Sequence, residues 1–343
     1  AGVMTASRKP LISVLGGGSW GTMVAQLVAV KGHRVRLWCR RPEQAREINK
    51  RRSNDRYLKG FKLSSRIMAT ANLALAVEDI PLVFVVIPAK SFRMVSRSIG
   101  EFLQPDQFVV HGTKGIEAGT YMRMSEILEE ETCVRQLGVL AGPNIAKEIG
   151  AGLPAGAVVA SRFPNLITAS QEALVSERLR VYANDDVVGV ELAGALKNIV
   201  AIASGMVSAL SLGENARALL VTRGLSEIAR VGVALGADPL TFSGVAGVGD
   251  LMVTCMSPHS RNHRVGAAIA RGETLEQVVE SLGMVAEGVH TSRVVSELIV
   301  SRGLDAPLLM GVKHVLDGKM TPVEALKYFM SLASRQDIDL ALR

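Results

Sequence analysis

Aromatic residues are scarce in this chain, at 4% of its 343 residues, although hydrophobic residues as a whole make up 48%. Aliphatic side chains must therefore fill its cores. Cysteine is scarce as well: Cys39, Cys133 and Cys255 stand far apart and form no C-x-x-C pair. The sequence contains no internal repeat and no low-complexity linker. The scattered cysteines argue against a disulfide framework and favour a reduced, intracellular protein, and the many aliphatic residues argue against a disordered chain.

We expect neither a signal peptide in the given sequence nor a nucleic-acid-binding surface. The first apolar run, in AGVMTASRKPLISVLGGG, is too short for a signal peptide and ends in glycines. The net charge of +7 suits either nucleic acid or an enzyme for anionic substrates. However, acidic residues interrupt the basic run RRPEQAREINKRRSNDR (40–56), and no aromatic ladder accompanies it. We expect a cytoplasmic protein that does not bind nucleic acid.

One segment, VELAGALKNIVAIASGMVSAL (190–210), is apolar almost throughout and nearly long enough to cross a membrane. Glu191, Lys197 and Asn198 would be costly in lipid, so a buried core helix is the better interpretation. A lysine in such a helix needs a partner or a function. The alternative for Lys197 is an amine that reaches solvent from the edge of the helix.

Short β-like runs alternate with helical patterns in the first half of the chain, which indicates a parallel sheet covered on both faces. From about residue 190 onward the pattern is helical, and Thr274–Glu276 and Thr321–Glu324 are helix start signals. We predict a doubly wound α/β domain over residues 1–189 and an all-α domain over residues 190–343. The expected strands are LISVL (11–15), RVRLWC (34–39), LVFVVI (82–87), QFVVHG (107–112), LGVLAG (137–142) and GAVVAS (156–161).

The sequence GGGSWG (16–21) matches the pattern G-x-G-x-x-G directly after the first expected strand and at the start of a helix. Gly16 allows a tight turn, Gly18 lets the backbone approach a pyrophosphate, and Gly21 lets helix and strand pack closely. The helix N-terminus offers N–H groups to the phosphates. The first domain is therefore predicted to be of the Rossmann type, although an ordinary glycine-containing turn is the alternative.

The end of the second expected strand bears on the choice of cofactor. A carboxylate at this place would hold the ribose 2′-hydroxyl of NAD, but the chain has Arg40 and Arg41 there. Arginine matches the geometry of a 2′-phosphate, so we favour NADP, with NAD also accepted. The alternative is that one or both arginines, Arg41 above all, point into solvent.

Further polar residues follow strand ends or lie between helices. Lys114 and the loop with Gly142 and Asn144 are expected at the carboxyl edge of the sheet, where such sheets bind ligands. In the segment 247–266, Asp250 and Thr254 share a face if the segment is helical, and Ser260, Arg261 and Asn262 offer a grip for a substrate phosphate. His259 and His263 have no third ligand nearby, so we expect no metal.

Together these motifs resemble the soluble NAD(P)-dependent glycerol-3-phosphate dehydrogenases in their bacterial form. They occur in the family's order and span most of the chain. They are GGGSWGT (16–22), GTKGIE (112–117), AGPNIAKEI (141–149), ELAGALKNIVAIASG (191–205), GVGDLMVTC (247–255), SRNHRVG (260–266) and AEGVHT (286–291).

The resemblance implies roles for individual residues. It makes Lys197 the catalytic lysine. The reaction that it implies suggests further catalytic roles for Lys114 and Asp250, which would shift the pKa of Lys197, and for Thr254, through which Asp250 could relay a proton. It implies cofactor contacts at Gly16, Gly18, Ser19, Trp20, Gly21, Arg40, Arg41, Lys114, Ala146, Arg261, Val285 and Glu287. It implies substrate contacts at Lys114, Gly142, Asn144, Lys197, Asp250, Ser260, Arg261 and Asn262. Two positions depart from the bacterial pattern: Asn144 stands where Ser or Thr is usual, and Gly17, where Ala is common, should change little.

The implied reaction is reversible hydride transfer between NAD(P)H and C2 of dihydroxyacetone phosphate, which yields sn-glycerol 3-phosphate, a phospholipid precursor. Lys197 would act as general acid and base. Burial and Lys114 would lower its pKa, whereas Asp250 would raise it. A homodimer is expected. The alternatives are a dehydrogenase for another hydroxy acid or sugar acid and an NADPH-binding sensor or scaffold without turnover.

Overall fold

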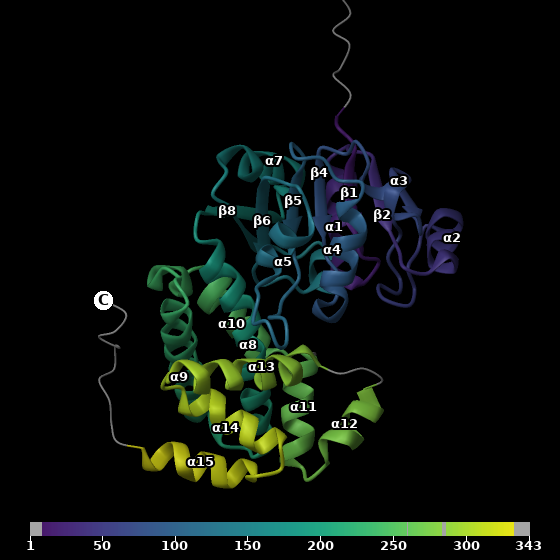
Figure 1. Ribbon diagram of the computed structural model, residues 1–343. Coiled ribbons are helices and arrows are strands. Elements are labelled where there is room, and N and C mark those ends of the chain that lie inside the picture. The colour runs from purple at the N-terminus through teal and green to yellow at the C-terminus, as the bar shows by residue number, and fades with distance from the viewer. Residues whose placement is uncertain (1–8, 259, 283–285, 333–343) are drawn as a thin grey trace, which may run out of the picture. The chain divides into compact units, whose positions relative to one another are not determined.

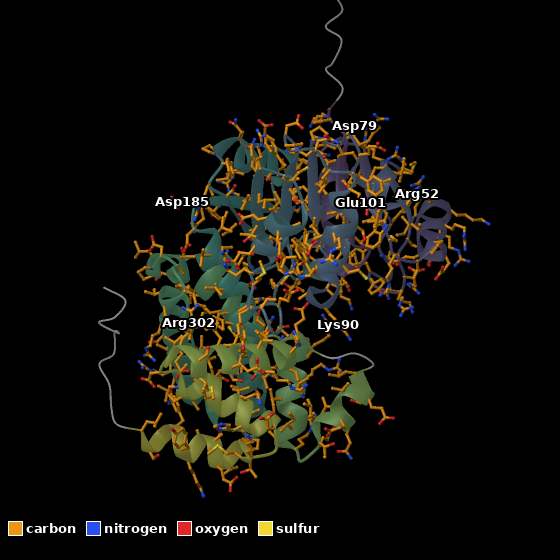
Figure 2. The ribbon with its side chains drawn as sticks, viewed as in Figure 1. Arg52, Asp79, Lys90, Glu101, Asp185 and Arg302 are labelled. Atoms are coloured by element: carbon orange, nitrogen blue, oxygen red, sulfur yellow. The ribbon has the colours of Figure 1, made fainter. Side chains whose placement is uncertain are left out.

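The computed structural model describes residues 9–258, 260–282 and 286–332, and the chain divides into two compact units. The first unit comprises Ala1–Thr113, Ser125–Leu140 and Asn144–Asp185, and the second comprises Lys114–Met124, Ala141–Pro143 and Asp186–Arg343. Asp185, labelled in Figure 2, ends the first unit. The strands all precede it, and each described element from Val187 onward is helical (Figure 1).

The first unit contains an eight-stranded sheet of order β3-β2-β1-β4-β5-β6-β7-β8. Strand β1 pairs in parallel with both β2 and β4, and the pairs β2–β3, β4–β5, β5–β6 and β7–β8 are parallel as well. The strand order reverses at β1 and β4, where sheets of this class bind ligands. The strands are β1 (Ile12–Leu15), β2 (Val35–Trp38), β3 (Ile67–Thr70), β4 (Leu82–Val85), β5 (Phe108–His111), β6 (Gln136–Ala141), β7 (Ala155–Ala160) and β8 (Leu179–Asn184).

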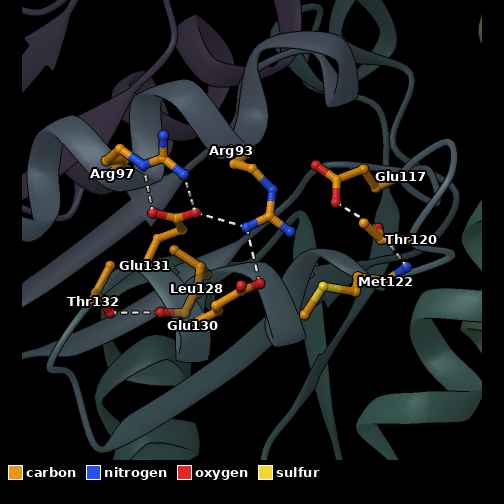
Figure 3. Close-up of polar contacts among 9 residues, drawn as sticks. All are labelled: Arg93, Arg97, Glu117, Thr120, Met122, Leu128, Glu130, Glu131 and Thr132. Atoms are coloured by element: carbon orange, nitrogen blue, oxygen red, sulfur yellow. Dashed lines mark hydrogen bonds and ion pairs between the residues drawn. The ribbon is translucent and has the colours of Figure 1, made fainter.

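Both faces of the sheet are covered, as its continuous apolar strands predicted. In β4, Leu82 and Phe84 belong to a core cluster that α1 and α7 complete, while Val83 and Val85, which point to the opposite face, are fully buried too. Arg93 and Arg97 of α4 both pair with Glu131 at the end of α5 (Figure 3). The helices are α1 (Ser19–Val30), α2 (Pro42–Arg51), α3 (Leu73–Val77), α4 (Phe92–Gly100), α5 (Met124–Glu131), α6 (Ala146–Gly150) and α7 (Pro164–Leu174).

Two strands were not predicted, and both lie at an edge of the sheet. Strand β3 is one edge and β8 is the other. In each, buried and more exposed residues alternate at the start of the strand. The six strands that were predicted lie between them and are largely buried on both faces, so their sequences are more continuously apolar and carry the stronger signal.

The helical unit is built around α8 (Val187–Ala209), the helix expected over 190–211. Among the described residues it is the one helix long and apolar enough to cross a membrane, and 89% of its most apolar window is buried within the protein, the environment of a core helix. The Asp186 carboxylate caps the helix by accepting the Gly189 N–H at 2.8 Å. Its neighbours are α9 (Gly213–Ala234), α10 (Asp250–Met256), α11 (Arg261–Ala270), α12 (Leu275–Leu282), α13 (Glu287–Arg302), α14 (Pro307–Leu316) and α15 (Pro322–Ser331).

Candidate active site

The glycine loop between β1 and α1 has the geometry that its three spaced glycines predicted. Gly16 has φ +128°, and a Cβ there would lie 1.9 Å from the carbonyl oxygen of Val86. A Cβ on Gly21 would lie 2.0 Å from the carbonyl oxygen of Gly16, so this glycine allows helix and strand to approach. A Cβ on Gly18, the residue before α1, would meet no atom within 4 Å. Open space at a helix N-terminus is where a phosphate is held by backbone N–H groups.

Gly17, between the first two glycines of the pattern, packs closely against two buried side chains. A Cβ there would lie 2.6 Å from Cys39 Sγ and 2.7 Å from Gln44 Nε2. Both side chains are buried, and the Gly17 carbonyl accepts hydrogen bonds from Gln44 Nε2 at 2.6 Å and Asn54 Nδ2 at 2.9 Å. An alanine at position 17 would therefore require the ends of the Cys39 and Gln44 side chains to shift, and the expectation that this position changes little stays a prediction.

Two alanine substitutions should separate the functions of these glycines. Gly21→Ala should lower the free energy of unfolding by about 1–3 kcal/mol or more, because the methyl group meets backbone. Gly18→Ala should leave the unfolding temperature unchanged and weaken NADPH binding, because its methyl group projects into space that a pyrophosphate would fill. Thermal unfolding and NADPH fluorescence titration measure the two effects. Equal binding by Gly18→Ala and the unmodified protein would contradict a phosphate site here.

The remaining residues assigned to the cofactor in the first unit lie around this loop and the end of β2. Arg40 is exposed directly after β2, whereas Arg41 is half-buried as the N-cap of α2, with its Nη2 3.5 Å from Gln44 Oε1. Arg40, rather than Arg41, is thus the arginine that reaches solvent. Ser19 Oγ donates to the carbonyl of Tyr57 at 2.9 Å. Trp20 is half-buried on α1, and Ala146 is buried at the start of α6.

In the helical unit, Lys197 lies inside a cluster of four functional side chains. Its ammonium group donates to the Asp250 carboxylate and to Thr254 Oγ1, the latter at 2.6 Å. Lys114 Nζ donates to the other Asp250 oxygen at 3.1 Å. Lys197 is 4% exposed and Asp250 is 1% exposed, so one buried carboxylate holds two ammonium groups. This arrangement excludes the alternative in which the Lys197 amine reaches solvent.

The local structure explains why Asp250 and Thr254 act together. A π-helical turn, Val245–Gly249, leads into α10, which begins at Asp250. Thr254 lies one turn later on the same face, as the i,i+4 spacing predicted, and its hydroxyl donates to the Asp250 carbonyl at 2.7 Å. Short π-helical turns often occur at functional sites.

Lys197 and Lys114 share Asp250, but their pKa values are shifted in opposite directions. Burial is the main cause that lowers the pKa of Lys197 to about 7; Lys114 acts in the same direction, and Asp250 acts to raise it. Burial also acts to lower the pKa of Lys114, but Asp250, its hydrogen bonds and Glu287 outweigh this and raise it. Lys197 can therefore exchange a proton near neutral pH while Lys114 stays charged.

The proposed phosphate grip lies at the N-terminus of α11, which packs closely on α8: a Cβ on Gly266 would lie 1.8 Å from the Ile202 carbonyl oxygen. Ser260 is the N-cap, and Arg261 is exposed on the first turn. Asn262 is buried, and its Oδ1 accepts the Gly288 N–H at 2.9 Å. The hydroxyl, guanidinium and amide thus occupy one helix end.

A polar residue of α8 went unnoticed as a site residue. Asn198, next to Lys197, is 4% exposed, and its Nδ2 has no hydrogen-bond partner among the described residues. A Cβ on Gly288 would lie 2.6 Å from the Asn198 carbonyl oxygen and 2.8 Å from Asn262 Oδ1, so the two asparagines are neighbours. A buried amide without a partner is costly, which indicates a missing ligand. The sequence signal was the polar pair Lys197–Asn198 in an apolar helix.

The other assigned residues are placed as follows. Gly142 belongs to the helical unit and has φ +130°, whereas Asn144 belongs to the first unit, where its buried Oδ1 has no hydrogen-bond partner in the described chain. Glu287 is the first residue of α13. Val285 lies outside the described residues.

Among residues 9–258, 260–282 and 286–332, no three His, Cys, Asp or Glu side chains are placed to hold a metal ion. Of the two histidines considered as ligands, His263 has its Nε2 3.1 Å from Ser208 Oγ, and His259 lies outside the described residues.

Comparison with known proteins identifies the family. Residues 11–166 match the model of the NAD-dependent glycerol-3-phosphate dehydrogenase N-terminus, and residues 186–327 match that of the C-terminus. The chain is 43% identical to the glycerol-3-phosphate dehydrogenase [NAD(P)+] of Teredinibacter turnerae over 96% of this chain and 97% of that protein. It is 45% identical to the Azotobacter vinelandii protein of that name over 97% of each.

A solved structure agrees with the sequence comparisons. The glycerol-3-phosphate dehydrogenase of Coxiella burnetii superposes with a TM-score of 0.90 at 34% identity, covering 94% of this chain and 99% of that one. The family models that match the two halves of the chain, the curated relatives and the solved structure all indicate the same family. The chain belongs to the NAD-dependent glycerol-3-phosphate dehydrogenase family.

Proposed function

We propose that the protein catalyses NAD(P)H-dependent, reversible reduction of dihydroxyacetone phosphate to sn-glycerol 3-phosphate, the activity in the names of its relatives. The observation that carries this proposal is the buried Lys197 ammonium, held by Asp250 and Thr254 beside Lys114. A buried lysine with a pKa near 7 is typical of a catalytic site and is not needed for a scaffold to bind its partners. The sensor alternative is therefore not favoured.

The nicotinamide cofactor, when bound, supplies the hydride for C2 and takes it back in the reverse direction. Negative charge then develops on the C2 oxygen, and Lys197 donates a proton to it; in oxidation Lys197 accepts that proton. Asp250 and Thr254 orient the ammonium group, and Lys114 adds a second positive charge. Arg261, Asn262 and Ser260 hold the substrate phosphate, with the Asn198 amide as a further donor.

The residues of the first unit fit a dinucleotide. Gly16 and Gly21 shape the turn, Gly18 leaves space at the N-terminus of α1, and the exposed Arg40 follows β2. These features support binding of the pyrophosphate at the loop, with Ser19, Trp20, Arg41 and Ala146 as further contacts and with Lys114, Arg261, Val285 and Glu287 contributing from the helical part. An arginine where NAD enzymes have a carboxylate supports a preference for NADPH.

Arg40→Ala tests that preference. Loss of a charge-assisted hydrogen bond to the 2′-phosphate should raise KM for NADPH by about 10- to 100-fold and leave KM for NADH within about twofold. Arg46→Ala is the matched control, since Arg46 is an exposed arginine of α2 that is not assigned to the cofactor. Equal changes for both cofactors in Arg40→Ala would contradict a role for Arg40 in reading the phosphate.

Several broader proposals follow from this assignment. Residues 1–189 bind the cofactor, and residues 190–343 supply the catalytic and substrate-binding groups, together with Lys114, Gly142 and Asn144. The enzyme works in the cytoplasm as a homodimer, and its product enters glycerophospholipid synthesis. Sedimentation analysis tests the dimer.

Product analysis tests the activity itself. The purified protein is mixed with NADPH or NADH and dihydroxyacetone phosphate, and consumption of the cofactor is followed by absorbance. We expect stoichiometric formation of sn-glycerol 3-phosphate and no turnover of 2-keto acids, which lack the phosphate that Arg261 would hold. Turnover of a 2-keto acid in preference to the phosphorylated ketone would establish the other dehydrogenase class instead.

A further inference from the structure

Lys114 reaches Asp250 from a loop rather than from one of the helices. The segment Lys114–Met124, here called the Lys114 loop, joins β5 to α5 in sequence but groups with the helical unit. A lysine at the end of a free loop would hold its amine poorly, because ordering a long side chain costs entropy. The position of the Lys114 amine therefore depends on what anchors this loop.

The Lys114 loop is ordered by its own hydrogen bonds. Ile116 and Arg123 form an antiparallel bridge, and the Glu117 N–H donates to the Met122 carbonyl at 2.9 Å. Thr120 Oγ1 donates to Glu117 Oε2 at 2.5 Å and accepts the Met122 N–H at 3.3 Å (Figure 3). These contacts close the loop into a small unit that would move as one piece.

Besides Lys114 itself, other residues of this unit contact the helices. Ile116 is 2% exposed and belongs to the core cluster around α8. Tyr121, which has φ +60°, donates from its hydroxyl to Glu297 of α13 at 3.1 Å. Arg123 Nη1 lies 2.5 Å from Glu191 Oε2 of α8, and the two side chains are only 18% and 3% exposed. A buried, charge-assisted contact of this kind is strong and directional.

Glu191 lies on the same helix as Lys197, less than two turns away. The Arg123–Glu191 pair thus ties the loop that carries Lys114 to the rigid element that carries Lys197. We propose that Arg123 and Glu191 are positioning residues, which hold the Lys114 loop against α8 and thereby keep the Lys114 amine on Asp250. This inference rests on the proposed function, in which Lys197 exchanges the proton.

The electrostatics give this proposal a distinctive consequence. The charged groups that shift the pKa of the two lysines are Asp250 of α10, Glu287 of α13 and the lysines themselves, and Cys255 of α10 lies close enough to Lys197 to be affected by its charge. Releasing Lys114 would remove a positive charge from beside Lys197 and leave Asp250 to Lys197 alone. Both changes favour the protonated amine. The pKa of Lys197 should therefore rise. Because water admitted by general loosening would also raise it, the release of Lys114 is identified by a shift that disappears in the Lys114→Met background.

Arg123→Met tests the proposal through the pH dependence of dihydroxyacetone phosphate reduction, in which protonated Lys197 is the active form. We expect kcat to fall and its descending limb to move up by about one pH unit. Arg230→Met is the matched control: Arg230 is 15% exposed in the same unit and is bound to Asp305. It should leave the limb in place. An unmoved limb in Arg123→Met would overturn the proposal.

A double-mutant cycle with Lys114→Met provides the second measurement. If Arg123 acts through Lys114, Arg123→Met should lower kcat/KM about tenfold in the unmodified protein and less than about twofold in Lys114→Met. Losses that multiply would overturn the proposal. Should Arg123→Met fail to fold, Glu191→Gln carries the same test, because it keeps the side-chain shape and removes the charge.

NMR titration of lysine labelled at the ε-carbon separates this proposal from the proposed function. Lys197→Met identifies the signal of Lys197, and no substrate is needed. A higher Lys197 pKa in Arg123→Met supports the positioning role even if dihydroxyacetone phosphate is not turned over, a result that would defeat only the proposed function. An unchanged Lys197 pKa in an enzyme that does turn over would defeat only the positioning role.

Discussion

Lys197→Ala should lower kcat for dihydroxyacetone phosphate reduction by about 10²–10⁴-fold, the range expected for loss of a general acid. Lys197 is the buried cation on Asp250 and Thr254, and burial brings its pKa to about 7. Lys114 should not replace it, because Asp250 raises the pKa of Lys114 and keeps its proton in place. Steady-state kinetics with NADPH measure the effect.

Lys197→Ala should slow the chemical step without weakening cofactor binding. Lys197 is not among the residues assigned to the cofactor, so Lys197→Ala should bind NADPH with unchanged affinity in a fluorescence titration. Lys313→Ala is a suitable control, since Lys313 is also a helical-unit lysine paired with an aspartate, Asp317. It should keep kcat within about twofold, as expected for a pair of this kind. Activity of Lys197→Ala within tenfold of the unmodified enzyme would contradict its role.

Asp250→Asn should be the most damaging substitution for the helical unit. Asp250 is 1% exposed and neutralises both Lys197 and Lys114. Removing one partner of a buried ion pair typically costs about 3–5 kcal/mol of unfolding free energy, because the remaining charge has no compensation. Since Asp250 raises the pKa of both lysines, its loss should leave Lys197 mostly neutral at pH 7. We therefore expect kcat to fall by about 10²-fold or more.

Urea unfolding and kinetics at several pH values test both effects. The residual activity of Asp250→Asn should rise toward acidic pH, where Lys197 regains its proton. Asp317→Asn, which removes a more exposed carboxylate from a pair within one helix, should change the unfolding free energy by about 1 kcal/mol or less. A stable Asp250→Asn enzyme with an unshifted pH profile would show that Asp250 does not control Lys197.

Much of the site could be predicted from the sequence because its signals are local. The glycine spacing predicted the turn at Gly16 and the close packing at Gly21, both of which depend on neighbouring backbone. The i,i+4 spacing of Asp250 and Thr254 predicted a shared helical face. Thr321 and Glu324 predicted the capping box at the start of α15.

The rest depends on contacts between distant segments, which no local pattern carries. Gly17 is constrained by Gln44 and Cys39, and the Lys114 loop is fastened by Arg123 to Glu191, 68 positions away in the chain. The sequence predicted that burial and Lys114 lower the pKa of Lys197 and that Asp250 raises it. The net pKa depends on distances between these groups, which the sequence does not contain. The edge strands β3 and β8 were missed because their exposed faces weaken the apolar signal.

The most direct test of the central role of Lys197 is the pH dependence of kcat in both directions. A single group that donates a proton in reduction and accepts it in oxidation must give opposite limbs at the same pKa. We predict that reduction slows above a pKa of about 7 while oxidation accelerates through it, and that Lys197→Ala removes both limbs. Limbs of the same direction, or limbs that persist in Lys197→Ala, would contradict the account.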